Sequence, residues 1–519
     1  MGINWFIKML DLLRSNPEIP LLLSTIIIFH LYFAKRNGVI PVNWPIVGMF
    51  PSIVAHLHNS HERIVQVLAA SGFTFVFRGP WFTGMDILCS CDPRNVNYVF
   101  NTHEQLYPKG HDLINILGAL GDCALTTEGE RWRWHRKTLL RVLSSCDFQK
   151  CMTQAIRNKV ESRLIPMLEN FSNENMVIDL QDVFSRLMLD SICTALIGVD
   201  PGCLDFNFPE IPFAQATNVI VQSSFYLHIV PKYIRRIMFK LNVGYFRKIA
   251  KAAKVMEQFI FQKFEEKKVF LINQGNHETA TNEPSDSDVL STLIYEKRTS
   301  CNDFTELLEV LKLNMRNVII GAVDANAASL VWFFWVLSKH PTVENKILEE
   351  LKKNWPDGLK HDTLFDKKGV QNLVYLHAAV CECLRLYPPI PFEVKTASQA
   401  DVLPSGHRVS PEMSLIFHTY SMARMEGIWG KDCAQFKPER WINEKGENRT
   451  EPAYKFFTFN CGPRTCLGKE SSLSSLKMVI AVILYNYHVK VDEGHVAKPK
   501  HGIVLLMKHG LMVQIWKRE

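Results

Sequence analysis

Apolar positions recur every three to four residues over long stretches of this chain, which is the pattern of amphipathic helices. The segment from about residue 51 to Asn273 has this pattern for most of its length, for example in FQKCMTQAIRNKVESRLIPML. Alternation with a period of two is confined to short runs such as HRVSPEMSLIF and IVLLMKHGLMVQIW. We expect the second of these runs to form a hairpin that turns near Lys508–Gly510. The pattern therefore predicts a mainly α-helical chain with minor β sheets.

A long helix is predicted from about Asp303 to His340, where Pro341 should stop it. Its middle, VIIGAVDANAASLVWFFWVL, is apolar nearly all round, which is typical either of a membrane span or of the centre of a large domain. Asp324 and Asn326 lie near its centre, where contact with lipid would be costly, so we favour a buried central helix. Another helix is predicted from Val370 to Tyr387, before a pair of prolines.

An uncharged apolar run, Ile19 to Ala34, lies near the N-terminus and is followed by Lys35 and Arg36. It is somewhat shorter than the roughly 20 residues of a full membrane span, and the charges that flank it favour a cytosolic position for the rest of the chain. A cleaved signal peptide is the alternative, although no small-residue cleavage site follows. We therefore predict a membrane-anchor helix with its cytosolic flank in residues 1–40 and a catalytic domain in residues 41–519, with a proline-rich hinge at 41–51.

Composition narrows the class of protein. The net charge of +7 over 519 residues is too small to favour nucleic acid as a partner. The 13 cysteines form no CxxC pair, and their odd number is typical of a reducing compartment with mostly buried thiols. No glycine pattern of a nucleotide-binding strand and helix is found. The polar run Ile272–Asp288 predicts a surface loop.

The segment from Phe459 to Gly468, FNCGPRTCLG, combines glycines, an arginine and a cysteine just before a predicted helix. The N-terminus of a helix offers free N–H groups and the positive end of a dipole, which lower the pKa of a thiol and stabilise the thiolate. Glycines let the backbone approach a flat cofactor closely, and Arg464 can pair with an anionic group on it. Cys466 is therefore a candidate metal ligand, although a lone cysteine is more often a small buried apolar residue.

This segment resembles the haem-binding signature of the cytochrome P-450 superfamily, in which Phe, Gly, Arg, Cys and Gly recur at these spacings. The resemblance implies the cytochrome P-450 fold, haem b as cofactor and Cys466 as the ligand of its iron, with Phe459 and Arg464 also binding the cofactor. Trp132 and Arg136 resemble the helix that reaches a haem propionate. We expect neighbouring His135 to be a satisfied or an exposed side chain rather than a second iron ligand, because the iron must keep its sixth position open for oxygen.

A second group of matching residues is predicted to be structural. Glu382 and Arg385, three residues apart, share one face of a helix. Arg440, in PERW, looks like the superfamily residue that completes a Glu–Arg–Arg cluster. A buried cluster of this kind needs several partners to offset desolvation, and we expect it to hold the core near the haem without taking part in catalysis.

The segments YPKG, DLQDVF, LHAAVCECLRLYPPIPFE and EPAYKFFTFNCGPR look like those of the plant mid-chain alkane hydroxylases, which are related to fatty-acid ω-hydroxylases. The resemblance implies a monooxygenase in the endoplasmic reticulum membrane, with its catalytic domain facing the cytosol. Electrons would come from NADPH through cytochrome P-450 reductase, docked near the cysteine loop, and cytochrome b5 is a further candidate partner. The substrate would be a lipophilic small molecule, by this resemblance a long-chain alkane or a fatty-acyl derivative. Four mostly apolar segments are predicted to contact it: Leu113–Leu120, Phe213–Phe225, Ile319–Ala325 and Ile390–Val394.

The central helix departs from the family pattern. Asp324 matches the usual acid, but Ala325 stands where the family has a hydroxyl residue, and alanine cannot relay protons. Three interpretations follow: Asn326, a water or the substrate replaces the hydroxyl; the enzyme oxidises without inserting oxygen, as in phenol coupling; or the chain turns over poorly. We therefore name Asp324 and Asn326 as candidate catalytic residues. A haem-binding sensor or scaffold without turnover is the alternative from another class of protein.

Overall fold

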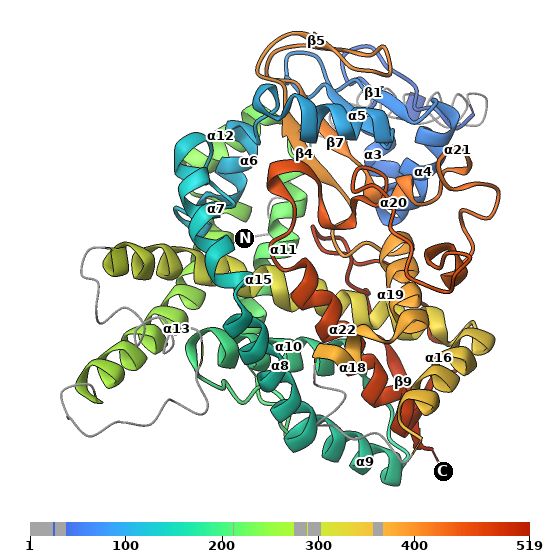
Figure 1. Cartoon of the computed structure of the whole chain (residues 1–519). Coiled ribbons are helices and arrows are strands. Elements are labelled where there is room, and N and C mark those ends of the chain that lie inside the picture. The colour runs from blue at the N-terminus through green and yellow to red at the C-terminus, as the bar shows by residue number, and fades with distance from the viewer. Residues whose placement is uncertain are drawn as a thin grey trace.

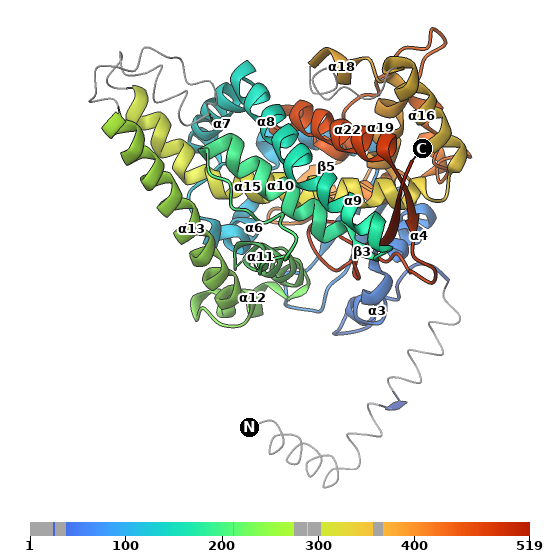
Figure 2. The same ribbon diagram turned by 90° about the horizontal axis from the view of Figure 1, so that it is seen from below.

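The computed structural model describes residues 24–25, 38–210, 212–274, 288, 303–356 and 367–518. Helix α15 (Asp303–Leu337) crosses the middle of the molecule (Figures 1 and 2). Among the described residues, its segment Leu313–Leu337 is the one helix that is long and apolar enough to cross a membrane. Most of that segment is buried within the protein, which confirms the prediction of a buried central helix.

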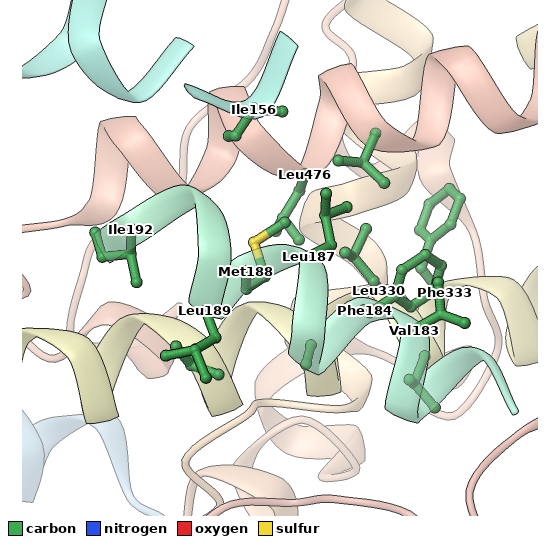
Figure 3. Close-up of a cluster of buried hydrophobic side chains, with 14 of the residues drawn as sticks. Ile156, Val183, Phe184, Leu187, Met188, Leu189, Ile192, Leu330, Phe333 and Leu476 are labelled. Carbon is green, nitrogen blue, oxygen red and sulfur yellow. The ribbon is translucent and has the colours of Figure 1, made fainter. Parts of the chain in front are cut away.

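The main hydrophobic core surrounds this helix. Figure 3 draws part of it, with side chains from α8 (Cys146–Lys159), α10 (Leu180–Ile197), α15 and α22 (Lys469–Asn486). Leu187, Leu330 and Leu476 represent three of these helices, and each is nearly inaccessible to solvent. Because α15 and α22 share this core, the start of α22 has a fixed position relative to the central helix.

The fold is mainly helical, as predicted. The remaining α-helices are α3 (Phe50–Ala55), α4 (Ser60–Ala70), α5 (Pro93–Asn97), α6 (Gly110–Leu117), α7 (Gly129–Leu143), α9 (Ile165–Glu174), α11 (Pro212–Ile229), α12 (Lys232–Lys240), α13 (Tyr245–Gln274), α16 (Pro341–Asn354), α18 (Lys367–Gln371), α19 (Val374–Leu386), α20 (Thr419–Met422) and α21 (Glu426–Trp429). The short turns used below are η2 (Tyr98–Thr102), η7 (Phe457–Phe459) and η8 (Gly462–Arg464).

Three small sheets accompany the helices in the described part of the chain. The largest has the strand order β1 (Thr74–Phe77), β2 (Ile87–Ser90), β7 (Ser414–Phe417) and β4 (Glu393–Thr396). The others pair β3 (Ile178–Asp179) with β9 (Met512–Lys517) and β8 (Tyr487–Val491), and β5 (Asp401–Val402) with β6 (Arg408–Val409). The run HRVSPEMSLIF thus supplies strands to two different sheets, and the β1–β2 hairpin interrupts the helical pattern near the N-terminus.

The predicted C-terminal hairpin is wrong. Strand β9 pairs antiparallel with β8, and at the predicted turn there is only an isolated bridge between Lys508 and Gly510. The Asp179 carboxylate accepts the Leu511 N–H at 2.8 Å, and this contact holds the chain at the turn. The residues before the turn instead enter the core, where the Leu505 N–H donates to the Pro389 carbonyl at 2.8 Å. Long-range partners therefore decided the pairing.

Two predicted helix boundaries also change. Helix α15 ends at Leu337, and Pro341 opens α16, where a proline is tolerated because the first N–H groups of a helix have no partner in the helix. The predicted helix from Val370 is split, since α18 ends at Gln371 and α19 starts at Val374. The Glu350 carboxylate accepts two backbone N–H groups in the first turn of α19, at 2.7 and 2.9 Å, and so caps the new helix.

Two predictions fall largely outside the described residues. Of the predicted anchor, only Ser24 and Thr25 are described. The predicted loop Ile272–Asp288 is described at residues 272–274, which belong to the end of α13, and at Asp288. The membrane anchor and the boundary at residue 41 therefore stay predictions.

Candidate active site

Cys466 lies between turn η8 and the start of α22, as the sequence predicts. Its backbone N–H donates to the Phe459 carbonyl at 2.8 Å, which closes the loop on itself. Gly468 is the N-cap of the 18-residue helix α22, and its N–H donates to the Cys466 sulfur. The Cys466 side chain is exposed. The loop thus presents one accessible sulfur at the N-terminus of a long buried helix.

The electrostatics of this thiol differ from the expectation. Burial raises the pKa of Cys466, and the Gly468 N–H and the Arg136 guanidinium only partly oppose this effect. The Cys466 sulfur is thus accessible although surrounding protein atoms raise its pKa, a combination that fits a position in a recess of the molecule. The N–H at the helix N-terminus does lower this pKa, as predicted, but burial outweighs it in the protein by itself. Coordination to a metal ion deprotonates a thiol outright.

Gly462 is required by packing within the protein. Its φ is +66°, and a Cβ atom there would lie 2.0 Å from the Phe100 carbonyl oxygen of η2. The sequence predicts that the glycines of the cysteine loop let a cofactor approach the backbone closely. At Gly462 the close neighbour is backbone, so this residue fixes the loop against η2.

Helix α7 contacts the same loop through two residues that the sequence singled out. The Arg136 guanidinium donates to the Thr465 carbonyl at 2.5 Å, beside Cys466. The Arg464 guanidinium lies over the Trp132 ring, 4.3 Å from its centroid. Trp132 and Arg136 are four residues apart and therefore share one face of the helix. The structure brings together all five predicted cofactor-binding residues: Trp132, Arg136, Phe459, Arg464 and Cys466.

Two lysines that the sequence reasoning missed join this group: Lys395, which is buried, and Lys109, which is partly exposed. Lys395 is 2% exposed, and its ammonium makes no hydrogen bond to a described residue, although the Glu104 carboxylate lies 3.7 Å away. Burial and the Arg464 charge lower the pKa of Lys395 and of Lys109 to about 8. Arg464 lies 3.4 Å from Glu104. The Lys109 ammonium donates to the Leu125 carbonyl at 2.8 Å, whereas the buried Lys395 ammonium has so few partners that it is suited to an additional anionic group, such as a carboxylate of a bound cofactor.

The central helix provides open space in the interior. Between Leu313 and Leu337, Gly321 is the one exposed residue, and a Cβ atom there would meet nothing within 4 Å. Ala322 and Ala325 beside it are partly exposed. Together with an accessible thiol and a group of cations, a helix face made of small residues fits a flat cofactor that carries carboxylates. The residues present therefore fit haem.

Asp324 and Asn326 occupy this helix in different ways. Asp324 is 7% exposed, one of its carboxylate oxygens has no hydrogen-bond partner, and burial raises its pKa to about 7 against the weaker opposing charge of Lys500. Asn326 donates from its side-chain amide to the Ala322 carbonyl at 2.8 Å, one turn back in the helix. One of the two N–H donors of the Asn326 amide is therefore used within the helix, whereas Asp324 can change its protonation state near neutral pH.

The raised pKa of Asp324 predicts a pH-dependent stability. Between the ordinary value of 3.8 and about 7, the folded state binds a proton that the unfolded state has released, so stability falls as pH rises through this window. Relative to Asp324→Asn, the unaltered protein should lose free energy of unfolding from about pH 4 to pH 7 and level off above. Unfolding midpoints of both proteins across this range test the prediction, and parallel profiles would contradict it.

His135 is a satisfied core residue, as expected. It is fully buried, with Nδ1 2.8 Å from the Asn314 amide nitrogen and Nε2 3.3 Å from the Asp122 carboxylate. Both ring nitrogens therefore have protein partners, and neither is available to a metal.

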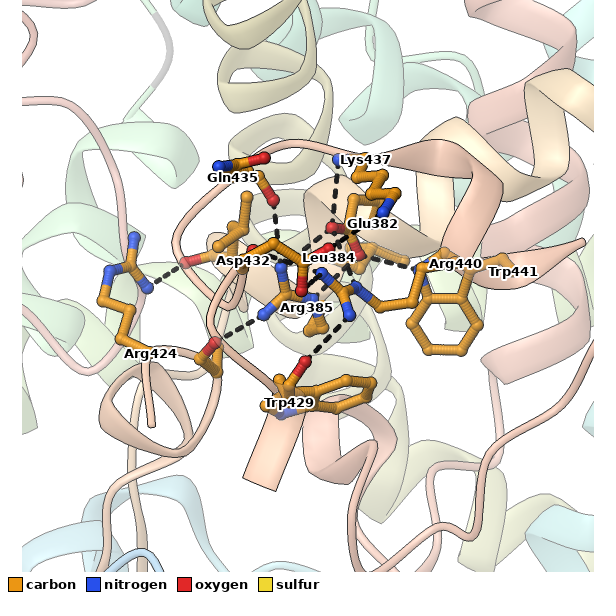
Figure 4. A network of polar contacts seen from close by, with 12 residues as sticks. Glu382, Leu384, Arg385, Arg424, Trp429, Asp432, Gln435, Lys437, Arg440 and Trp441 are labelled. Atoms are coloured by element: carbon orange, nitrogen blue, oxygen red, sulfur yellow. Dashed lines mark hydrogen bonds and ion pairs between the residues drawn. The ribbon is translucent and has the colours of Figure 1, made fainter. Parts of the chain in front are cut away.

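The predicted Glu–Arg–Arg cluster is formed (Figure 4). Arg385 binds the Glu382 carboxylate in a bidentate manner, with both N–O distances 2.8 Å, and Arg440 reaches the same carboxylate at 3.4 Å. The Trp441 indole donates to Glu382 at 2.9 Å. Thr458, in the turn before the cysteine loop, donates to the Leu384 carbonyl of α19 at 2.9 Å. The cluster is thereby connected to the cysteine loop through α19.

A pocket of about 550 Å³, part of it open to solvent, lies beside this site. Leu113, Ile116 and Val394, from two of the four predicted substrate segments, line it. The sequence analysis missed its other side, which α12 supplies through Lys232 and Arg235. The third segment contributes Val221 to another cluster, where it packs with Ala328, Val504 and Leu506. Ile319 and Val323 of the fourth segment belong to the main hydrophobic core.

Comparisons with known proteins agree with this geometry. The family model "Cytochrome P450" matches residues 40–515. A noroxomaritidine synthase of Narcissus aff. pseudonarcissus MK-2014 is 39% identical, over 97% of this chain and 96% of the relative. The alkane hydroxylase MAH1 of Arabidopsis thaliana is 36% identical, over 94% and 96%, and cytochrome P450 86B1 of the same plant is 35% identical, over 98% and 92%.

The predicted resemblance to plant alkane hydroxylases is thus confirmed, and a relative named for a different reaction is at least as similar. The family uses haem b, with electrons from NADPH delivered by a reductase. The chain belongs to the cytochrome P450 family and is an oxidoreductase of the monooxygenase type.

Proposed function

We propose that this enzyme hydroxylates a lipophilic chain, a long-chain alkane or a fatty-acyl derivative, at the recess between the Cys466 loop and the central helix. The observations that carry the proposal are the accessible Cys466 sulfur at the start of α22 and the small accessible residues of α15, a helix that shares its core with α22. The apolar residues Leu113, Ile116 and Val394 in the adjoining pocket support a lipophilic substrate.

The cofactor would be held by residues of the Cys466 loop and its neighbours. Cys466 would hold the haem iron through its thiolate, and Arg136, Lys395 and Arg464 would pair with the haem carboxylates. When bound, haem supplies the activation of dioxygen. Phe459 would pack beside the cofactor, where its carbonyl already accepts the N–H of Cys466. The remaining tasks of the protein are to position the substrate and to deliver protons.

Proton delivery would depend on Asp324. A carboxyl with a pKa of about 7 is present in both protonation states at neutral pH, so it can take up and release a proton. Ala325 offers no hydroxyl to continue the relay, and one N–H of the Asn326 side-chain amide donates to the Ala322 carbonyl. The second N–H of Asn326, a water molecule or a hydroxyl of the substrate would therefore complete the path from Asp324.

Ala325→Thr tests this account of proton delivery. Threonine restores a hydroxyl at a partly exposed position, so hydroxylated product per NADPH consumed should rise, by up to about 100-fold. Ala325→Val is the matched control, because valine has nearly the same volume and no hydroxyl. Product analysis in membranes that contain a plant reductase, with long-chain alkanes and phenolic compounds offered together, measures the effect. An equal response to threonine and valine would show that the missing hydroxyl is not the weak point.

A second candidate function is oxidation without oxygen insertion, such as the coupling of phenolic rings. The observation in its favour is Ala325, since a reaction without insertion has less need of the missing hydroxyl. The product analysis above separates the candidates, because coupled phenols without hydroxylated chains would favour this one. A haem-binding paralogue with little turnover would consume no NADPH with any substrate offered.

The enzyme would work on the endoplasmic reticulum membrane, held by the predicted N-terminal anchor, with its catalytic domain in the cytosol. Outward-facing apolar side chains on α12, namely Tyr233, Ile234 and Ile237, each more than half exposed, support contact with a lipid surface. The reductase would dock near the Cys466 loop, and cytochrome b5 would be a second donor of electrons.

A further inference from the structure

The pocket beside the site is lined by charge as well as by apolar side chains. Lys109, Lys232 and Arg235 line it, and Asp112 is the one carboxylate among its lining residues. His228 also lines it, but burial lowers the pKa of His228 to about 4, so this imidazole is neutral at physiological pH. Three cations against one carboxylate leave the lining with an excess of positive charge.

The single carboxylate is shared between the two cations of α12 that line the pocket, Lys232 and Arg235. Asp112 lies 3.1 Å from Arg235 and 3.5 Å from Lys232, and these three side chains are between 12% and 20% exposed. Lys232 also reaches Glu412 at 2.9 Å, but the Glu412 side chain is 74% exposed. Two cations that share one partly buried carboxylate can accept a second carboxylate at low desolvation cost, because they are already largely removed from water.

The arrangement of side chains on α12 is the reverse of that on an ordinary surface helix. Ile234 and Ile237 face outward, with 53% and 58% of their surfaces exposed, whereas Lys232 and Arg235 are turned inward. A surface helix in water ordinarily has the opposite arrangement. Cations turned inward add nothing to the solubility of the helix, and an anionic ligand in the pocket would compensate for their burial.

We propose that this pocket binds the carboxylate end of a long-chain fatty acid, with Lys232 and Arg235 as its anchor. The chain would lie along Leu113, Ile116 and Val394 toward the recess at Cys466. This inference rests on the proposed function and narrows its substrate to a free acid. An uncharged alkane leaves the cations without an added partner, and a protonated amine is repelled by the lining, so neither gains from this part of the pocket.

The first test uses two probes that differ in charge, dodecanoate and 1-dodecanol. Both are titrated into the haem-loaded protein, and binding is followed by calorimetry and by the shift of the haem absorption band. Arg235→Leu should weaken dodecanoate roughly 10- to 150-fold, the range for a hydrogen bond to a charged group, and should leave 1-dodecanol nearly unchanged. Arg236→Leu is the matched control, because Arg236 is the next residue of the same helix and does not line the pocket. It should change neither affinity.

The second test is a substitution that should strengthen dodecanoate binding. Asp112→Asn removes the competing carboxylate, so it should strengthen dodecanoate binding by about fivefold or more and leave 1-dodecanol unchanged. A purely structural contact between α6 and α12 would instead weaken both probes in this variant. Equal affinities for the two probes in the unaltered protein, or binding of neither probe, would overturn the inference. If the inference fails in this way but the enzyme hydroxylates alkanes, the proposed function stands. If the protein binds dodecanoate selectively but hydroxylates no chain, only the proposed function is overturned.

Discussion

Cys466→Ser should abolish both substrate turnover and the spectral signature of a haem thiolate. Serine is nearly isosteric, so the loop should keep its shape, with the backbone N–H of residue 466 still donating to the Phe459 carbonyl. A serine hydroxyl is a much weaker donor to iron than a thiolate, and the electron density that favours cleavage of the O–O bond is lost with the sulfur. The carbon monoxide difference spectrum of the reduced protein and NADPH-dependent product formation measure the two effects.

Cys461→Ala is the matched control for this substitution. Cys461 lies in the same loop, but it is 1% exposed. It packs with Phe100 and Phe457 in a hydrophobic cluster separate from the main core. Burial raises the pKa of its thiol to about 12, so it has no tendency to form a thiolate. The Cys461→Ala protein should keep the haem-thiolate spectrum and most of its turnover. Retention of the spectrum in Cys466→Ser, or its loss in Cys461→Ala, would contradict the assignment of the sulfur.

Glu382→Gln should lower the free energy of unfolding by roughly 3–5 kcal/mol, the cost of leaving a buried charge without its partner. Glu382 is fully buried and accepts hydrogen bonds from Arg385, Arg440 and the Trp441 indole. A neutral amide cannot balance the two guanidinium groups, which stay buried beside it. Because Thr458 connects α19 to the cysteine loop, the purified variant should also retain less haem.

The control for this prediction is an ion pair at the surface. Glu169 and Lys517 lie 2.7 Å apart, with 45% and 65% of their side chains exposed. Glu169→Gln should change the free energy of unfolding by less than about 1 kcal/mol and should leave the haem content unchanged. Denaturant-unfolding midpoints and the haem content of the purified proteins give both comparisons. Equal effects of the two substitutions would show that the buried cluster does not stabilise the core in this way.

The features that could be predicted from the sequence depend on short spacings. The Cys466 loop, the pair Trp132 and Arg136 on one helix face, and the pair Glu382 and Arg385 are all local patterns. A helix or a tight loop converts such a spacing directly into proximity. Arg440 was placed correctly for another reason, because it lies in a segment that resembles the family pattern.

The features that could not be predicted depend on contacts between distant segments. Lys109 and Lys395 look like ordinary surface residues, and only the pairing of β4 and the position of α6 bring both of them near Arg464. The run from Ile503 to Trp516 alternates as a hairpin would, yet Asp179 and Pro389 hold it in other places. Alternation indicates which face of a segment is apolar and does not identify its partner.

The pKa of the Cys466 thiol could not be predicted from the sequence for a different reason. Its place at a helix N-terminus is visible in the sequence, and this favours a low pKa. The opposing effect, burial by the surrounding loop and helices, depends on the fold and is the larger one. Asp324 follows the same rule, since burial in the centre of α15 sets its pKa. A local motif thus identifies the reactive atom, while the fold determines its protonation.

The central claim is that the sulfur of Cys466 is bonded to the haem iron, and X-ray absorption at the iron edge of the purified protein tests it most directly. The unaltered protein and Cys461→Ala should each show one sulfur in the first coordination sphere of the iron, and Cys466→Ser should show none. An iron with only nitrogen and oxygen neighbours in the unaltered protein, or a sulfur neighbour that persists in Cys466→Ser, would contradict the claim.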